Sequence, residues 1–183
     1  LNFLQKHTLI EIEYSREEPA KSLHPHTKLK RELARHRISH KALFIHPFLR
    51  FWFYFIAPNM RLLKEGRNDL FFKDFTTKFS SYTSLVFEEL SEILLDYHLR
   101  DSQIISSGSY WDASIEIDIL TVTEDEKVFV AECKWTNGTI NKGEWHKLLE
   151  KCSKLGISPS QCIFFAKRGF SKELLLHKGR SLA

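Results

Sequence analysis

Cysteine is scarce in this sequence, and its placement excludes the small domains that metal ions or disulfides hold together. The only cysteines are Cys133, Cys152 and Cys162. Their number is odd, and their spacing matches neither a zinc site nor a disulfide framework. All three lie among apolar residues, so we expect buried free thiols in a reducing compartment, the cytoplasm.

A long hydrophobic run is also missing. The most apolar stretch, residues 42–57, is too short to span a bilayer comfortably, and His46, Pro47 and Arg50 interrupt it. We therefore expect no membrane partner, and we predict a buried, aromatic-rich helix that begins at Pro47. No signal peptide is visible, and the chain begins without methionine inside a helix-like pattern, so we expect a fragment of a longer protein.

A large excess of one charge is absent as well. Lysine and arginine number 27 against 23 aspartates and glutamates, which gives a net charge of +4. This balance permits a nucleic-acid partner without arguing for one. Six basic residues gather between residues 21 and 37, opposed only by Glu32. This segment is either a solvated helix face or connector, or a patch that contacts phosphates.

What the sequence does contain is the composition of a folded protein, with 43% hydrophobic and 27% charged residues among 183. Its periodicity predicts an α/β fold, in which a mixed β-sheet of about four strands is flanked by helices. We expect residues 1–60 to be small and mainly helical, the C-terminal part of a winged-helix-like segment plus the aromatic helix. Residues 61–183 would form the sheet-containing domain. Its expected elements are helices at 68–79 and 83–98, strands at 103–107, 114–123 and 127–135, a helix at 142–155, a strand at 161–166 and a helix at 170–177.

The helix at 83–98 is the longest one expected in the second part. We expect it to begin after a break at Ser80 and Ser81, which offer N-caps. A helical wheel gathers five apolar residues on the face that should be buried, namely Val86, Phe87, Leu90, Ile93 and Leu94.

Two neighbouring strands carry charged side chains in a pattern that indicates a site. In the strand at 114–123, alternation puts Glu116 and Asp118 on one face, and Ile115, Ile117 and Ile119 on the other. The simplest interpretation is that the two acidic side chains are the solvent side of an edge strand. The strand that follows makes a second interpretation possible.

In the strand at 127–135, Glu132 and Lys134 share a face with Val128 and Val130. Charges at the end of an otherwise buried strand are costly unless they are paired or bound to a metal. The obvious hairpin register places Asp118 across from Glu132. Two such carboxylates repel each other and need a cation, for which Mg²⁺ is suited. The alternative is a surface ion pair of Glu132 and Lys134, worth little.

The pattern EID…AECK resembles the PD-(D/E)XK nucleases, in which an aspartate ends one strand and E-x-K follows on the next. Asp118, Glu132 and Lys134 fall on those positions. The resemblance implies a restriction-endonuclease-like core and metal-dependent hydrolysis of phosphodiesters. Asp118 and Glu132 would hold Mg²⁺ or Mn²⁺ with the carbonyl of Cys133, and Lys134 would orient the attacking water or stabilise charge. Glu88 would be the first-helix glutamate that supports the metal, with the neighbouring glutamate as the alternative.

More narrowly, the stretches HPFLRFWFYFIAPN, VFEEL, GSYWD, EIDIL and AECKW resemble the nuclease-like C-terminal domain of archaeal-type P-loop ATPases, a domain of unknown function. The resemblance runs from about residue 42 to residue 170. It implies DNA and an ATPase domain of the same full-length protein as partners. No glycine-rich phosphate loop is present in this sequence, and His46 stands where that family's aromatic motif has an aspartate.

Two other functions remain open at this point. Many relatives of the fold have lost catalysis, so the chain is alternatively an inactive DNA-binding or regulatory module attached to the ATPase. It could also be a protein-interaction domain, whose aromatic helix at 47–56 docks against the ATPase or against a second copy in a homo-oligomer.

Overall fold

The computed structural model describes residues 2–14, 40–112 and 114–177. The chain divides into two compact units, Leu1–Thr77 and Lys78–Ala183, and the boundary falls inside a long helix. The sequence had placed the boundary after residue 60. The basic segment at 21–37 lies outside the described residues.

The first unit opens with helix α1 (Asn2–Lys6) and a two-stranded antiparallel sheet. Strand β1 (Ile10–Glu13) pairs with β2 (Lys41–Phe44), so that Ile10 lies opposite Phe44. The winged-helix interpretation of residues 1–60 stays a prediction.

The aromatic segment then runs through four short helical elements. Helix α3 (Pro47–Phe51) begins with proline in its first turn, as predicted. A π-helix (Trp52–Ile56), a 3-10 helix (Ala57–Asn59) and α4 (Met60–Lys64) follow. Phe55 is fully buried, but Phe48 and Phe53 are 67% and 52% exposed, so the prediction of a buried helix is wrong for these two side chains. The ring of Phe55 lies 4.6 Å from the ring of Phe75, measured between their centres.

Helix α5 (Asn68–His98) is a single helix of 31 residues, so the break predicted at Ser80 and Ser81 does not exist. The face predicted to be buried is also wrong. Leu95 and Leu99 are buried, with Phe87 packed against the same core, whereas Leu90, Ile93 and Leu94 are each more than half exposed. The buried row follows the i, i+4 spacing of a helix and passes over Ser91. The buried hydroxyl of Ser91 donates a hydrogen bond to the Phe87 carbonyl of the same helix. Because the Ser91 side chain is small, the helix can lie close to the sheet.

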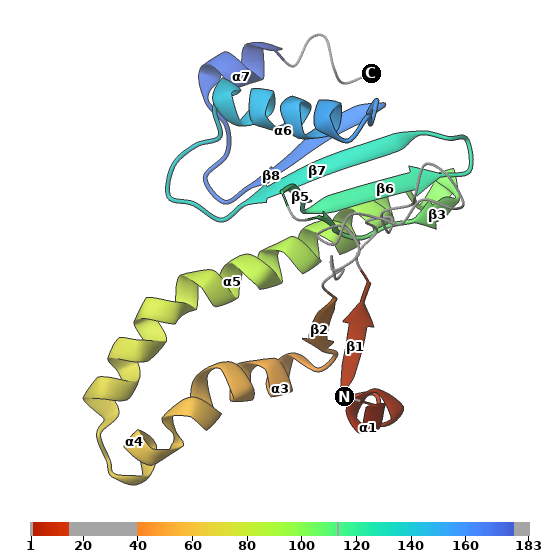
Figure 1. Ribbon diagram of the computed structural model, residues 1–183. Coiled ribbons are helices and arrows are strands. Elements are labelled where there is room, and N and C mark those ends of the chain that lie inside the picture. Colours follow the sequence, from red (N-terminus) through yellow and green to blue (C-terminus); the bar gives the residue numbers. More distant parts are fainter. Residues whose placement is uncertain (1, 15–39, 113, 178–183) are drawn as a thin grey trace, which may run out of the picture. The chain divides into compact units, whose positions relative to one another are not determined.

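The second unit is a mixed four-stranded sheet of the kind predicted, with the strand order β3-β6-β7-β8 (Figure 1). Strand β6 (Ile119–Thr123) pairs antiparallel with β3 (Ile104–Ser106) and β7 (Val128–Lys134), and β7 pairs parallel with β8 (Gln161–Ala166). The parallel connection needs a crossover, which α6 (Lys142–Lys154) supplies. Helix α7 (Lys172–His177) follows β8.

Two cores cover the two faces of this sheet. On one face the C-terminal half of α5 packs against β6 and β7, and on the other α6 packs against β7 and β8 (Figure 1). The members of the α5 core are Leu95, Leu99, Ile119, Phe129, Ala131 and Cys133. Those of the α6 core are Ile117, Leu120, Val130, Leu148, Cys152 and Cys162.

The strand predicted at 114–123 is broken by a bend at Asp118. Its first half, β5 (Glu116–Ile117), pairs with β4 (Tyr110–Trp111) as a separate two-stranded sheet. Ile117 therefore packs in the α6 core and Ile119 in the α5 core, so the prediction that they share one face is wrong. The bend is the reason, because it interrupts the alternation of an extended strand.

In the described part of the chain, no helix combines the length and the apolar character that crossing a bilayer requires.

Candidate active site

The predicted pair Glu132 and Lys134 lies at the carboxyl end of β7, on the α6 face of the sheet. Strand β7 lies between β6 and β8, so this position is central. Glu132 is 3% exposed, and Lys134 is partly exposed. A buried carboxylate on a central strand is not the weak surface pair that was the alternative, because its charge has been removed from water.

Asp118 lies beside Glu132, although it lies one residue beyond the hydrogen-bonded pairing of β6 with β7. The last paired residues of β6 and β7 at this end are Ile119 and Ala131, and one further step in the same register brings Asp118 level with Glu132. The carboxylate of Asp118 accepts the backbone N–H of Cys133 at 2.7 Å. Its side chain thereby serves as a hydrogen-bond acceptor for β7 where the backbone of its own strand bends away.

The electrostatics show that two carboxylates have been brought together. Burial raises the pKa of Asp118, and the nearby charge of Glu132 raises it further. The Cys133 N–H and the lysines Lys134 and Lys151 act in the opposite direction without cancelling the rise. An added cation would relieve this repulsion.

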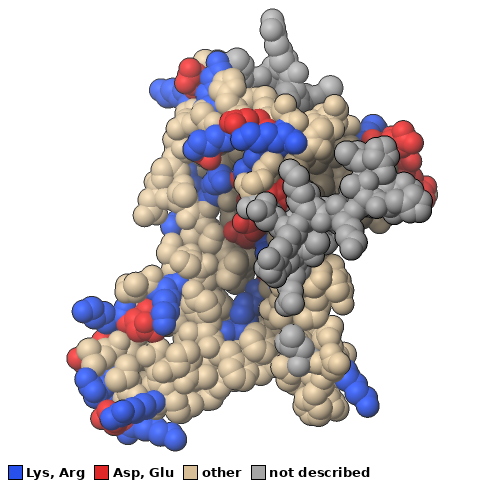
Figure 2. Space-filling view, in the orientation of Figure 1, with Lys and Arg blue, Asp and Glu red and all other residues tan. Residues whose placement is uncertain are grey.

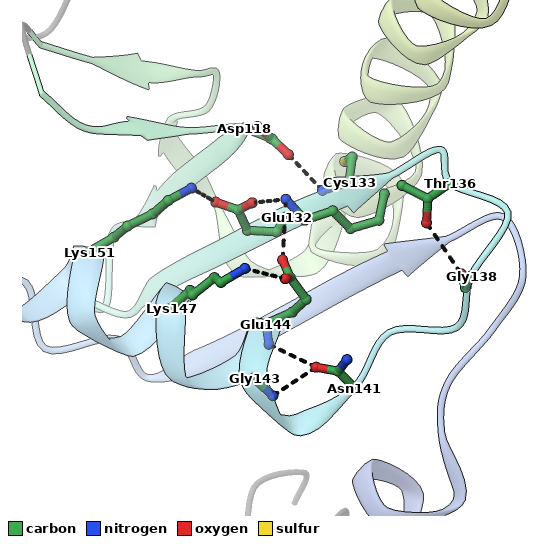
Figure 3. A network of polar contacts seen from close by, with 11 residues as sticks. Asp118, Glu132, Cys133, Thr136, Gly138, Asn141, Gly143, Glu144, Lys147 and Lys151 are labelled. Carbon is green, nitrogen blue, oxygen red and sulfur yellow. Dashed lines mark hydrogen bonds and ion pairs between the residues drawn. The ribbon is translucent and has the colours of Figure 1, made fainter.

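Two lysines place positive charge at the Glu132 carboxylate, with one ammonium group at each oxygen. Lys134 Nζ donates to Oε2 at 2.7 Å, and Lys151 Nζ donates to Oε1. Figure 3 shows the ammonium of Lys151 reaching Glu132 from α6. Burial disfavours the charged form of Lys134, but the Glu132 carboxylate outweighs it, so the pKa of Lys134 is raised.

The network continues along α6. Glu144 Oε2 lies 3.8 Å from Lys134 Nζ, and Glu144 Oε1 accepts from Lys147 Nζ at 2.7 Å, which lowers the pKa of Glu144. Asn141 caps this helix and accepts the Glu144 N–H, which fixes the start of α6 beside the strand end (Figure 3). The network thus contains equal numbers of carboxylates and ammonium groups and is neutral as a whole. The carboxylates are those of Asp118, Glu132 and Glu144, and the ammonium groups are those of Lys134, Lys147 and Lys151.

Sequence reasoning had not found Lys151 or Glu144. A signal was present, because Glu144, Lys147 and Lys151 recur at the i, i+3, i+7 spacing of one helix face. The helix that crosses over between parallel strands must pack on the sheet. Charged residues on its inner side therefore have to meet partners on the strands.

Glu88 belongs to the other face of the sheet. It lies on α5, where its charge acts on the thiol of Cys133, and it accepts a long 3.4 Å hydrogen bond from Ser84. Across residues 2–14, 40–112 and 114–177, no three His, Cys, Asp or Glu side chains gather as a metal site, so Glu88 is not grouped with Asp118 and Glu132.

The donor set on the α6 side nevertheless fits magnesium. Mg²⁺ is usually held by one or two carboxylates, with waters and substrate phosphates completing the shell. Asp118 and Glu132 are two such carboxylates, and the carbonyl of Cys133 lies in the chain between Glu132 and Lys134. All of these donors are hard oxygens. A softer, thiolate-bound metal is not indicated, because burial raises the pKa of the Cys133 thiol to about 12.

The expectation of buried free thiols is confirmed for all three cysteines. Burial also raises the pKa of Cys162 to about 11 and the pKa of Cys152. These thiols belong to the two cores and not to the chemistry of the site.

Comparison with known proteins matches residues 52–148 to the DUF234 family, described as archaeal and bacterial proteins of unknown function. The matched region is more than half of the chain and includes Asp118, Glu132 and Lys134. The chain belongs to the DUF234 family. The DUF234 region ends inside α6, before Lys151.

A curated relative is an uncharacterized protein of Methanocaldococcus jannaschii, 27% identical over 93 residues. These residues are 48% of this chain and 21% of that protein, so the chain spans about a fifth of the length of the relative. No solved structure matches the chain.

Proposed function

We propose that this chain is a metal-dependent nuclease module that acts on DNA, carried by a larger protein with an ATPase domain. The observation that carries the proposal is the buried carboxylate of Glu132 on the central strand, with Asp118 beside it and Lys134 hydrogen-bonded to it. The order helix, three strands, crossover helix, strand is that of the PD-(D/E)XK core. The length of the archaeal relative supports a larger protein.

Each residue has a role that follows from its position. Asp118 and Glu132, with the carbonyl of Cys133, would hold Mg²⁺ or Mn²⁺. The bound ion would polarise the scissile phosphate and lower the pKa of the attacking water. The ammonium of Lys134 projects from the same strand two residues beyond Glu132, where it would stabilise charge on the phosphate or orient the water.

Support for a nucleic-acid partner comes from the strand ends next to the site. The Lys167 N–H donates to the Lys134 carbonyl, and the Lys167 ammonium lies 4.7 Å from the centre of the Trp135 ring. A lysine and an aromatic ring together suit contact with a phosphate and a base. Charge alone does not carry the argument, because basic and acidic side chains are intermixed over α6 in Figure 2.

The second candidate is an inactive DNA-binding or regulatory module of the same larger protein. One observation favours it: both oxygens of Glu132 already have lysine partners, so the cluster is satisfied without a metal. A cluster of this kind can persist as a structural element after catalysis has been lost.

Replacing Lys134 by methionine should separate the two functions. We expect cleavage of plasmid and single-stranded DNA with Mn²⁺ to fall about 100-fold, because the variant lacks the charge that stabilises the transition state. DNA binding should change little. The measurement is the cleavage rate at saturating DNA, with EDTA as the metal-free reference.

The matched control is Lys154→Met, which removes a lysine on helix α6 that pairs with Glu150 outside the site. It should cleave at the wild-type rate. If the wild type binds DNA but cuts neither substrate with Mn²⁺ or Mg²⁺, the chain is the inactive module.

A further inference from the structure

We infer that Lys151 is a positioning residue of this site: its ammonium holds the carboxylate of Glu132 in the metal-free protein, and an incoming divalent cation must displace it. The inference rests on the proposed function, since it assumes that Glu132 is a metal ligand. It adds a residue that lies outside the region matched to the family.

The first support is the geometry of Glu132. The carboxylate is almost completely buried, and each of its oxygens carries one lysine, Lys134 on Oε2 and Lys151 on Oε1. A cation that binds this carboxylate must therefore displace one of the two ammonium groups or share a carboxylate oxygen with it. The question is which lysine gives way.

The second support is that, among the described residues, only Lys134 of the two lysines has a second carboxylate within ion-pair distance. Lys134 Nζ lies 3.8 Å from Glu144 Oε2. The ammonium group can therefore move to that carboxylate and remain at the strand end. Among the described residues, the carboxylate that Lys151 contacts is Glu132. Its side chain is 31% exposed, and its flexible stem lets the ammonium withdraw into water.

The third support is that Lys151 already places a positive charge on a predicted metal ligand that has a second carboxylate beside it. It contacts Glu132 directly, and the register of β6 and β7 brings Asp118 level with Glu132. Lys151 thus supplies Glu132 with positive charge of the kind that a bound cation would supply. Because the network of three carboxylates and three lysines is neutral, a divalent cation adds two positive charges to it, and the withdrawal of one ammonium group halves that excess.

The test is Mn²⁺ binding to the full chain, measured by calorimetry without nucleic acid. Replacing Lys151 by methionine keeps a stem of similar length but removes the competitor, so the affinity for Mn²⁺ should rise about tenfold, which corresponds to about 1.4 kcal/mol. Lys151→Arg keeps the positive charge and should bind Mn²⁺ like the wild type. Lys154→Met removes one charge from the same helix outside the site and should change the affinity less than about twofold.

The direction of the change separates a competitor from a structural residue. If Lys151 only supported the fold of the site, its loss would weaken Mn²⁺ binding, and that result would overturn the inference. Equal affinity of the wild type and Lys151→Met would also overturn it, while leaving the metal site itself intact. No heat with any of the four proteins would overturn both the inference and the proposed function. Urea unfolding of each variant shows whether it is folded, and Lys151→Gln replaces the methionine variant if that one is not.

Discussion

Replacing Glu132 by alanine is expected to lower the free energy of unfolding of the second unit by about 3 kcal/mol and to leave no detectable cleavage. The substitution removes the carboxylate shared by Lys134 and Lys151, and breaking a buried ion pair leaves an uncompensated charge, at a cost of about 3–5 kcal/mol. We take the lower end because the two lysine side chains are 28% and 31% exposed. The measurement is the urea midpoint, followed by tryptophan fluorescence.

A matched control for this prediction lies on α6. Glu150 pairs with Lys154 at 2.8 Å on the helix surface, where both side chains are well exposed. Glu150→Ala removes the same chemical group but should leave the urea midpoint nearly unchanged, because surface pairs contribute little. Equal midpoints for the two variants would mean that Glu132 is not the buried centre of an ion-pair network.

Replacing Asp118 by asparagine is expected to have the opposite effect on stability while reducing cleavage about 1,000-fold. The pKa of Asp118 is raised in the folded protein by burial and by Glu132, so its ionisation is disfavoured there. An asparagine carries no charge, and its side-chain oxygen still accepts a hydrogen bond from the Cys133 N–H. The loss of cleavage follows from the loss of a metal-binding carboxylate.

The pH dependence of stability tests the sign of the expected effect of Asp118→Asn. A carboxyl group whose pKa is higher in the folded than in the unfolded chain makes folding less favourable as the pH rises through the folded-state pKa. The asparagine variant should therefore melt at a higher temperature than the wild type at neutral pH. The difference should disappear as the pH falls below the ordinary value of 3.8. A variant that is less stable at neutral pH would show that the charged Asp118 serves the fold.

Together the two substitutions separate a carboxylate that stabilises the fold from one that destabilises it. Glu132 is held by the fold with two lysines, whereas burial and the neighbouring Glu132 carboxylate raise the pKa of Asp118. A carboxylate that disfavours its own fold is more readily understood as a ligand for a cation than as a structural group.

The sequence predicted the centre of the site because that centre depends on short-range rules. Glu132 and Lys134 follow two valines at the same alternation, and this pattern alone places them at the buried end of a strand. The hairpin register that joins Asp118 to Glu132 follows from the tight turn at residues 124–126. Both rules act over a few residues, so a single sequence contains the information.

The sequence did not predict what depends on the packing of distant elements. The bend at Asp118 separates Ile117 from Ile119, and it exists because the first half of the strand pairs with β4 instead of continuing in the main sheet. The α5 face was mispredicted because apolar content favoured Leu90, Ile93 and Leu94. The sheet instead contacts the row through Ser91, a residue that hydrophobicity does not single out.

The central claim is that Asp118 and Glu132 bind one divalent cation, and the most direct test is a titration of the wild-type chain with Mn²⁺ followed by NMR. Paramagnetic Mn²⁺ broadens the amide signals nearest to it. At low Mn²⁺ the amides of Asp118 and Cys133 should broaden first, and added Mg²⁺ should restore them. The acidic turn at residues 124–126 is an exposed rival at the other end of the hairpin. Broadening confined to that turn, or no selective broadening, would contradict the account.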